Sequence, residues 1–229
     1  MKSLIIIPAF NEEMNIERVV RSLKESCPQH DFIVVNDGSS DHTADICRAN
    51  GFPLLDLPVN LGLAGAFQAG MKYAYLKDYD CAVQFDADGQ HLAEYIDDLI
   101  SEMKTGMDIV IGSRFVTEKK PWNARMLGSR VISAAIRLTT GKRIKDPTSG
   151  MRLYNRSMIR EFALNLNFGP EPDTVSHLVK RGARVSEVQV QMQERMEGES
   201  YLTFARSVTY MLRMTISCLL YTSDAADEL

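Results

Sequence analysis

The stretch Cys81-Ala82-Val83-Gln84-Phe85-Asp86-Ala87-Asp88-Gly89-Gln90 places two carboxylates directly after a short apolar run, where a buried strand is expected to end. Such a pair suits a divalent cation, because Mg²⁺ and Mn²⁺ take oxygen ligands and usually share one or two protein carboxylates with the phosphates of a substrate. Taken alone, Asp86-Ala87-Asp88 fits a solvated surface turn equally well, since Asp-Gly is a standard turn signal. The surrounding strands and loops have to decide between these interpretations.

The composition predicts one α/β domain in a reducing compartment. A length of 229 residues is enough for a single domain with a sizeable core. A net charge of -4, with both signs interspersed, argues against a nucleic-acid partner. Because the cysteines lie in apolar or helical patterns without CxxC spacing, we expect buried free thiols. They are Cys27, Cys47, Cys81 and Cys218.

The apolar segments are too short for a secretion signal or a spanning helix. Pro8 interrupts the first run, Leu4-Ile5-Ile6-Ile7, far below signal-peptide length. No uninterrupted apolar stretch of about 18 residues follows. We therefore expect a cytoplasmic protein.

The last part of the chain carries two further expectations. The amphipathic segment 201–217 fits a peripheral contact with the inner face of the membrane, and packing on the core or on a second copy fits it as well. Residues 218–229 break the helical pattern and resemble translated adapter sequence rather than native protein. We leave them out of the expected domain, which covers 1–217.

Strand-like and helix-like segments alternate along the first half of the chain. We expect strands at 4–7, 32–35, 54–57, 81–85 and 109–111. The helices are expected at 12–26, 41–48, 62–76 and 95–103. This order predicts an α/β fold with a mostly parallel central sheet, joined and flanked by crossover helices.

The pattern changes after residue 115. A basic, loop-like segment at 117–122 precedes an amphipathic helix at 125–138. Turn residues dominate 141–150, alternation at 183–190 predicts a half-exposed strand, and a final amphipathic helix is expected at 201–220. We interpret this region as the acceptor side of the domain.

Polar loops follow four of the expected strands, and the carboxyl ends of parallel strands meet at one edge of a sheet. The loops are Pro8-Ala9-Phe10-Asn11-Glu12, Asn36-Asp37-Gly38-Ser39-Ser40-Asp41, the Asp86/Asp88 pair and Gly112-Ser113-Arg114. Three acidic loops beside an arginine fit a nucleotide whose base and ribose meet carboxylates while its diphosphate meets a metal and a cation.

Together with Asn60-Leu61-Gly62 and Asp146-Pro147-Thr148-Ser149-Gly150-Met151-Arg152, these loops resemble the motifs of family 2 glycosyltransferases, and most those of the polyprenyl-phosphate (dolichol-phosphate) branch. The resemblance extends to about Met214. It implies a Rossmann-like GT-A fold, a UDP- or GDP-linked sugar donor, Mg²⁺ or Mn²⁺, and inversion at the anomeric carbon. It divides the domain into a nucleotide-sugar-binding half, 1–115, and an acceptor-binding half, 116–217.

The resemblance also implies roles for single residues. The residues implied to line the nucleoside pocket are Pro8, Ala9, Phe10 and Glu12, with Asp37 on the base. Asp86 lies by the ribose and the metal, Asp88 is the principal metal ligand, and Gln90 is a neutral partner nearby. Arg114 stands near the donor diphosphate or the acceptor phosphate. Arg125 and Ser129 fall where lipid-phosphate transferases keep an arginine and a serine for the acceptor.

Asp146 and Arg152 flank a turn that resembles the segment closing over the sugar site. With a hydroxyl acceptor, Asp146 is the candidate general base, because the attacking oxygen has to lose its proton. A phosphate acceptor is already an anion and needs no base. Asp146 would then position the sugar or an arginine.

Several of these residues also have purely structural interpretations. Pro8 can simply end a strand, Asp37-Gly38 can be a plain turn, and Phe10 can fill the core. His91 fits a metal ligand or, with more weight, a surface histidine at a helix start. Arg125 and Ser129 fit a solvated helix face.

Two glycine-containing segments carry open interpretations. Asn60-Leu61-Gly62-Leu63-Ala64-Gly65-Ala66 lacks GxGxxG spacing, so we interpret it as close helix–sheet packing and reject a dinucleotide-binding dehydrogenase. Arg195-Met196-Glu197-Gly198-Glu199-Ser200 resembles the family's Arg-x-x-Gly-x-Ser element and equally resembles a turn.

The sequence therefore predicts an inverting glycosyltransferase with polyprenyl phosphate as the favoured acceptor. The second choice of acceptor is a hydroxyl of a cell-wall or extracellular polysaccharide. A nucleotidyltransferase is disfavoured because no Gly-rich, lysine-bearing loop follows the first strand. A non-catalytic nucleotide-sugar sensor is disfavoured by intact Asp88 and Arg114.

Overall fold

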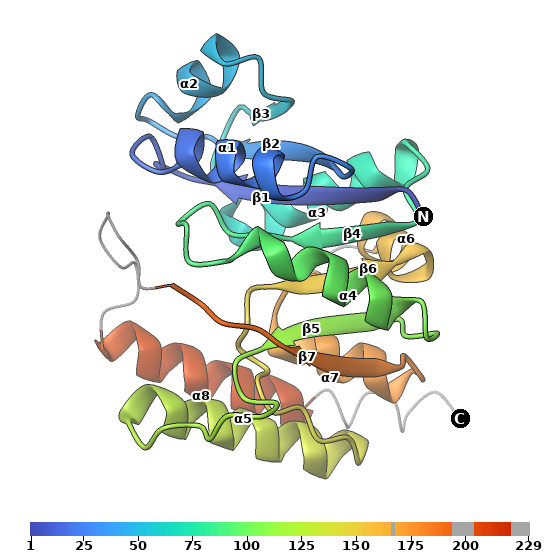
Figure 1. Cartoon of the computed structure of the whole chain (residues 1–229). Helices are drawn as coiled ribbons and strands as arrows, with labels where there is room; N and C mark the ends of the chain where they lie inside the picture. The colour runs from blue at the N-terminus through green and yellow to red at the C-terminus, as the bar shows by residue number, and fades with distance from the viewer. Residues whose placement is uncertain (166–167, 194–203, 221–229) are drawn as a thin grey trace.

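A seven-stranded sheet forms the centre of the molecule in the computed structural model, which describes residues 1–165, 168–193 and 204–220 (Figure 1). The strands are β1 (Ser3–Ala9), β2 (Asp31–Asp37), β3 (Leu54–Leu57), β4 (Cys81–Gln84), β5 (Ile109–Ser113), β6 (Arg152–Asn155) and β7 (Val185–Gln189). Their spatial order is β3-β2-β1-β4-β6-β5-β7. All pairs are parallel except those of β6, which runs antiparallel between β4 and β5. The expected mostly parallel sheet is confirmed.

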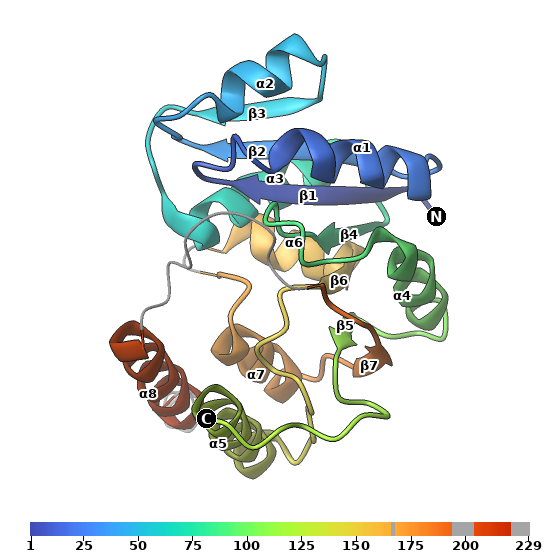
Figure 2. The same ribbon diagram turned by 60° about the vertical axis from the view of Figure 1, so that its left-hand side comes forward.

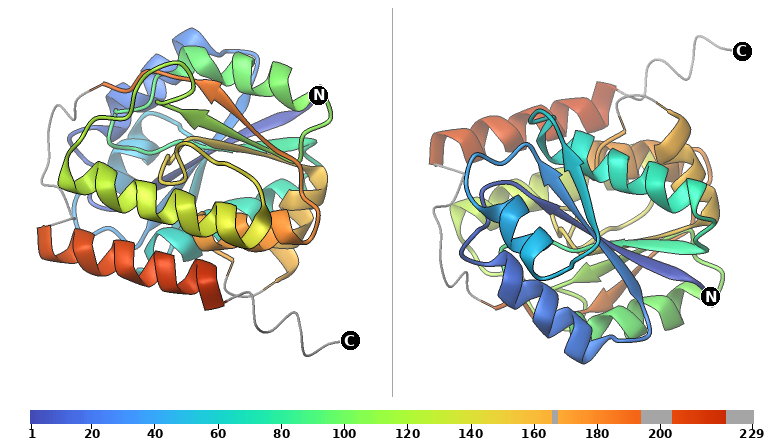
Figure 3. Two further views of the ribbon diagram at one scale, coloured as in Figure 1. Left: turned by 90° about the horizontal axis from the view of Figure 1, so that it is seen from below. Right: turned by 90° about the horizontal axis from the view of Figure 1, so that it is seen from above.

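Helices cover both faces of this sheet. They are α1 (Ile16–Ser26), α2 (Thr43–Ala49), α3 (Gly62–Leu76), α4 (Ile96–Met103), α5 (Ala124–Thr140), α6 (Arg156–Leu164), α7 (Pro172–Lys180) and α8 (Phe204–Leu220), with a short 3₁₀ turn η1 (Ala93–Tyr95) before α4. Helices α1, α2 and α4 pack on one face, and α3, α6 and α7 pack on the other. Helices α5 and α8 lie side by side beyond α7, as Figure 3 shows from below.

Alternation along β1 explains why its apolar run is continuous. Ile5 and Ile7 belong to the core cluster under α1 and α4, whereas Leu4 and Ile6 belong to the cluster under α3. A strand buried on both faces needs apolar residues at every position, unlike a strand with one face in water. All four side chains are fully buried.

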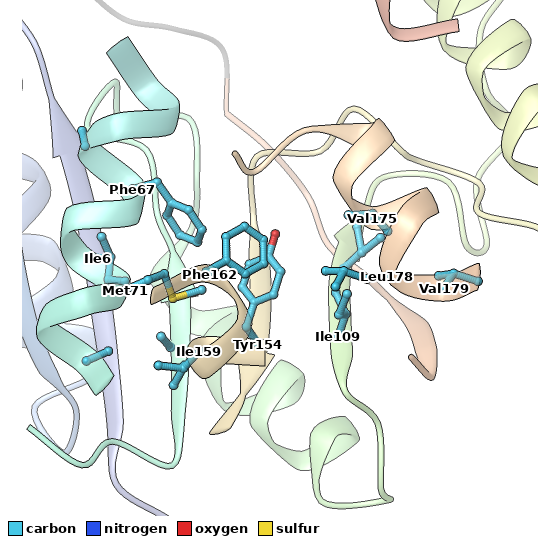
Figure 4. Packing of buried hydrophobic residues seen from close by; sticks show 14 of the residues in the cluster. Ile6, Phe67, Met71, Ile109, Tyr154, Ile159, Phe162, Val175, Leu178 and Val179 are labelled. Carbon is cyan, nitrogen blue, oxygen red and sulfur yellow. The ribbon is translucent and has the colours of Figure 1, made fainter. Parts of the chain in front are cut away.

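Three aromatic side chains pack together in the core cluster under α3 (Figure 4). Phe67 of α3 lies 5.6 Å from Tyr154 of β6 and 5.4 Å from Phe162 of α6, measured between ring centroids. Tyr154 and Phe162 meet at 4.9 Å in an edge-to-face arrangement, a geometry that adds to the area they bury. This group anchors β6 and α6 to the nucleotide-side half of the sheet.

Three elements of the second half were not expected from the sequence: β6, α6 and α7. Strand β6 has four residues and begins with the charged Arg152, so it shows no apolar run. The first-half elements match the expectations to within a few residues, apart from α1. That helix begins at Ile16 rather than at residue 12, because Glu12 and Asn15 form a turn in which Asn15 N donates to Glu12 O at 2.9 Å.

The four cysteines are free and buried, as expected. Burial raises the pKa of the Cys47 thiol to about 11, which keeps it protonated and unreactive. Cys218 also packs in the core, and α8 continues to Leu220, past the expected domain end at residue 217. Cys218 follows Met214 by four residues, so both side chains lie on the same face of α8 and both are buried. No helix in the described ranges is long and apolar enough to cross a bilayer.

Candidate active site

A cleft of about 370 Å³ opens at the carboxyl ends of the parallel strands. Figure 2 shows β1 and β2 ending on the same side of the molecule. The expected site residues that line the cleft are Pro8, Ala9, Phe10, Glu12, Asp37, Asp86 and Asp88. The start of α3 supplies the rest of the wall, with Asn60, Gly62, Leu63 and Ala66. The structure thus brings three strand-end loops into one pocket, of a size typical for small-molecule sites.

The carboxylate of Asp37 ties the end of β2 to the start of α3. Its Oδ1 accepts a hydrogen bond from Leu61 N at 2.7 Å. The next residue, Gly38, has φ +65°, and a Cβ there would come within 2.7 Å of Val59 C and Asn60 N. Only glycine fits this conformation and this contact. The Asp37-Gly38 pair therefore does more than turn the chain: it shapes the wall of the cleft.

Glu12 also lines the cleft and is buried beside the loop between β2 and α2. Its Oε2 accepts from Asn15 Nδ2 at 2.8 Å, and its backbone N donates to Thr43 Oγ1 at 2.9 Å. Asp41 accepts hydrogen bonds from Thr43 N and from Glu13 N, each at 3.0 Å. Burial alone would raise the pKa of Asp41, but the hydrogen bonds from Thr43 and Glu13 outweigh it and lower that pKa. The loops after β1 and β2 are thereby locked together.

The two carboxylates after β4 have different surroundings. Asp88 Oδ1 accepts only the Gln90 backbone N–H among the described hydrogen bonds, at 3.0 Å. Asp86 Oδ1 accepts from Gln84 Nε2 at 3.2 Å, and the Asp86 side chain keeps 33% of its surface exposed. Gln90 does not belong to the residues that line the cleft, and its carbonyl accepts from Gln193 N at 2.9 Å.

The interpretation of His91 as a surface residue is wrong. Only 5% of it is exposed, and it does not belong to the residues that line the cleft. Its Nδ1 accepts the Asp86 backbone N–H at 3.1 Å, and its Nε2 lies 3.7 Å from Asp86 Oδ2. A Cβ on Gly150 would collide with Asp86 Oδ2, so that glycine is needed for Asp86 and His91 to sit where they do. The buried His91 ring therefore holds Asp86 in position through the hydrogen bond to its backbone N–H.

The chemistry of this corner fits Mg²⁺ or Mn²⁺. Asp86 and Asp88 both reach the cleft, and no group of three or more His, Cys, Asp or Glu side chains gathers around a metal position among the residues described. A hard cation that takes one or two protein carboxylates and completes its shell with water and phosphate oxygens needs no larger set.

Arg114 and Asp146 form a two-pronged ion pair next to β5. Arg114 Nε donates to Asp146 Oδ2 at 2.7 Å, and its Nη2 donates to Oδ1 at 2.8 Å. The Asp146 side chain is completely buried, while that of Arg114 is 22% exposed. Both carboxylate oxygens are therefore engaged by the guanidinium, which Asp146 holds in a fixed orientation.

Two expected acceptor-side residues, Arg152 and Ser129, do not line the cleft. Arg152 is buried and donates to Pro170 O and Pro147 O, each at 2.6 Å, so it joins two loops. Ser129 is buried on α5, and its Oγ accepts from Lys120 Nζ at 2.8 Å. Arg125 falls in α5, but its side chain is outside the described residues. The Arg195-to-Ser200 motif is also outside them.

The family model of glycosyl transferase family 2 matches residues 4–162. The chain belongs to this family. Curated relatives include the polyprenol monophosphomannose synthase of Mycolicibacterium smegmatis, 30% identical over 88% of this chain and 81% of the relative. The undecaprenyl-phosphate mannosyltransferase of Micrococcus luteus is 33% identical over 89% of this chain and 88% of the relative. The chain is a glycosyltransferase.

Solved structures show the fold of this glycosyltransferase. The Mycobacterium tuberculosis glucosyl-3-phosphoglycerate synthase in complex with UDP superposes with a TM-score of 0.71 at 20% identity, over 95% of this chain and 80% of that one. Its complex with Mn²⁺ and UDP-glucose gives a TM-score of 0.69 at 20% identity, over 96% and 79%. The expected GT-A fold is confirmed.

The sequence missed two parts of the site. The start of α3 lines the cleft, although its Asn60-Leu61-Gly62 motif was interpreted as packing. Close packing comes instead from Gly70, where a Cβ would collide with Ile6. Asn60-Leu61-Gly62 follows the carboxyl end of β3, and this position could have indicated that the motif lies at the cleft. No local signal marked His91 as the partner of Asp86.

Proposed function

We propose that this glycosyltransferase moves a sugar from a UDP- or GDP-linked donor to polyprenyl phosphate, with inversion at the anomeric carbon. The observation that carries the donor half is the cleft itself. It gathers Glu12, Asp37, Asp86 and Asp88 in one pocket, and these carboxylates can accept hydrogen bonds from a nucleoside and share a cation with a diphosphate. Two relatives named for transfer to a polyprenyl or undecaprenyl phosphate support the acceptor.

Asp88 and Asp86 would hold Mg²⁺ or Mn²⁺ in this reaction, with Asp88 as the principal ligand and Gln90 nearby. The ion would act as a Lewis acid and stabilise the charge that develops on the departing nucleoside diphosphate. Pro8, Ala9 and Phe10 would line the nucleoside pocket.

The state of Asp146 favours a phosphate acceptor over a hydroxyl. A hydroxyl acceptor needs a general base, and both oxygens of the candidate base accept hydrogen bonds from Arg114. A phosphate oxygen attacks the anomeric carbon without losing a proton. Asp146 then acts by fixing Arg114, whose guanidinium can bind the phosphate oxygens. Transfer to a polysaccharide hydroxyl remains the second candidate.

The acceptor half of the domain, 116–217, would face the lipid. We propose that Arg125, Ser129 and Arg152 support the acceptor site, and that α8 contacts the cytoplasmic face of the membrane peripherally. Several large apolar side chains of α8 are exposed and lie on one face of the helix. They are Leu212, Ile216, Leu219 and Leu220.

A transfer assay tests the proposal. The protein is incubated with Mn²⁺ and radiolabelled UDP- or GDP-sugars, with and without polyprenyl phosphate, and the label in the organic extract is counted. Label in the extract only when polyprenyl phosphate is present supports the proposal. Label transferred instead to added polysaccharide supports the hydroxyl alternative. Absence of both transfer and donor hydrolysis with every sugar contradicts an active enzyme.

A further inference from the structure

A second cavity, of about 650 Å³, lies between the loop after β5, helix α5 and the loop before β6. It shares no lining residue with the cleft. Its charged lining residues are Lys119, Lys120, Arg130, Arg137, Arg143 and Lys145, against the single acid Glu118. In a chain with a net charge of -4, this is a strong local excess of positive charge.

The cations divide into two groups by their contacts. One group holds the walls together: Arg130 of α5 donates to Pro121 O at 2.9 Å, and Lys145 Nζ joins two loops by donating to Val116 O at 2.8 Å. The other group is exposed and includes Arg137 and Arg143, whose side chains make no hydrogen bond or ion pair with any residue that the structure describes. These two guanidiniums remain available to a ligand.

The cations of the cavity are not neutralised by ion pairs. Within the described ranges, none of the six makes an ion pair within 4.0 Å. Burial lowers the pKa of Lys120, and the charges of Arg114 and Arg130 act in the same direction, which outweighs the opposing effect of Asp146 and Glu187. An anion bound here would reduce the repulsion among the cations.

The rim of the cavity is apolar. Trp122 is 84% exposed, and the Arg130 guanidinium lies 4.2 Å from the centroid of its ring. Leu127, Val131 and Leu138 are also exposed on α5 and, four and seven residues apart, they form a stripe beside the cavity residues of that helix. Figure 3 shows α5 on the surface of the molecule, next to α8.

We propose that this cavity binds phosphate headgroups of an anionic lipid bilayer, with Trp122 and the α5 stripe in the interfacial region. Cations beside tryptophan and aliphatic side chains are typical of surfaces that lie on anionic membranes. A small soluble anion would satisfy the cations but would leave the exposed tryptophan and stripe without a partner. The inference goes beyond sugar transfer: it assigns a lipid-headgroup site separate from the donor cleft.

Trp122 is the only tryptophan in the chain, so its fluorescence reports directly on the rim. The full chain is titrated with vesicles of phosphatidylglycerol and phosphatidylcholine, with vesicles of phosphatidylcholine alone, and with inorganic phosphate. A blue shift with the anionic vesicles only, weakened by added salt, is the expected result. A shift of equal size with neutral vesicles or with inorganic phosphate, or no shift at all, overturns the proposal.

A charge-matched pair of variants tests the cavity itself. The double variant Arg137→Gln/Arg143→Gln should bind anionic vesicles about 25-fold more weakly. Each cation near such a surface strengthens binding about fivefold, and the two contributions multiply. The control is Lys24→Gln/Lys104→Gln, which removes the same charge from exposed positions on the opposite side of the sheet. It should retain binding, and an equal loss in the control would overturn the proposal. Thermal melting and UDP binding of each variant confirm that it is folded.

Discussion

At the scale of single residues, the site depends on which atoms already have partners. Asp88 reaches the cleft with one described hydrogen bond, Asp86 is backed by His91, and Asp146 is committed to Arg114. Three carboxylates on neighbouring loops thus have three different sets of partners. Their surroundings, rather than their residue type, support the proposed distinction between a metal ligand and a residue that positions an arginine.

Replacing Asp88 with Ala should reduce transfer at least about 1,000-fold, since Lewis-acid stabilisation is worth several kcal/mol and each 1.4 kcal/mol is about tenfold. The side chain is only partly buried, so the melting temperature should change little. Transfer rates and Mn²⁺-dependent UDP binding by calorimetry measure the effect. An unchanged rate would remove the metal role from Asp88.

His91→Ala should lower kcat/KM about 10- to 100-fold, as loss of a residue that orients a metal ligand commonly does. His91→Asn should recover much of this loss, because its side-chain oxygen can replace Nδ1 as the acceptor of the Asp86 N–H. Steady-state kinetics on both variants measure the difference. If Asn is no better than Ala, the hydrogen bond to Asp86 is not what matters.

Arg114 and Asp146 should behave as one unit. In a double-mutant cycle with Arg114→Gln and Asp146→Asn, urea unfolding should give a coupling energy of about 1 to 3 kcal/mol. Each single variant leaves the other charged side chain without its ion-pair partner. The Asp146→Asn enzyme should transfer to polyprenyl phosphate more slowly with an unchanged shape of its pH profile. Loss of the rising limb of that profile would indicate a general base instead.

At the scale of elements, the cleft is fixed by loops that hold one another. Asp37 ties β2 to α3, and Asp41 ties the loop after β2 to the loop after β1. Strand β6, which the sequence did not reveal, joins β4 to β5 and so places Asp146 beside Arg114. The site is therefore assembled by connections between elements more than by any single motif.

Asp41→Asn should destabilise the fold by about 1 kcal/mol at pH 7, through weaker hydrogen bonds from Thr43 and Glu13. The folded-state pKa of Asp41 is lowered, so its contribution is present above the unfolded value of about 3.9 and is lost as the pH falls through the folded value. The difference between wild type and variant should thus shrink toward pH 3. Chemical unfolding at both pH values measures it.

The control for this prediction is Asp45→Asn on α2. Among the residues that the structure describes, Asp45 pairs only with the exposed Arg48 and His42, so its loss should change stability by less than about 0.5 kcal/mol at either pH. A difference for Asp41→Asn that is as large at pH 3 as at pH 7 would contradict the linkage.

At the scale of the whole molecule, one continuous sheet carries both the cleft and the second half of the domain. Helices α5 and α8 form an outer layer on that second half, and the basic cavity opens beside α5 (Figure 1). The cleft and the proposed membrane-facing layer are thus parts of one packed domain. Ligand binding at the cleft should therefore raise the free energy of unfolding of the whole domain.

UDP with Mn²⁺ should raise the melting temperature of the protein. Ligand at 100 times its dissociation constant stabilises by about 2.7 kcal/mol, and about 2 to 4 °C per kcal/mol is usual for a domain of this size. Differential scanning fluorimetry should therefore show a shift of about 5 to 10 °C, which EDTA should largely remove. A shift of the same size in EDTA would argue against metal-assisted binding of the diphosphate.

The residues of the cleft and the family resemblance are readable in the amino-acid sequence. Apolar periodicity located the parallel strands, and parallel strands bring their carboxyl ends to one edge, so Glu12, Asp37 and Asp88 were expected to meet there. It also predicted four buried thiols and most of the first-half elements. These are properties that local pattern and chain direction dictate.

Which distant side chains meet depends on tertiary packing. The pairing of Arg114 with Asp146 spans 32 positions along the chain, and Arg152 proved to be buried between two loop carbonyls. The basic cavity likewise draws its cations from two loops and a helix. Such contacts depend on how β6, α5 and the loops pack against each other, and periodicity along a chain carries no record of that packing.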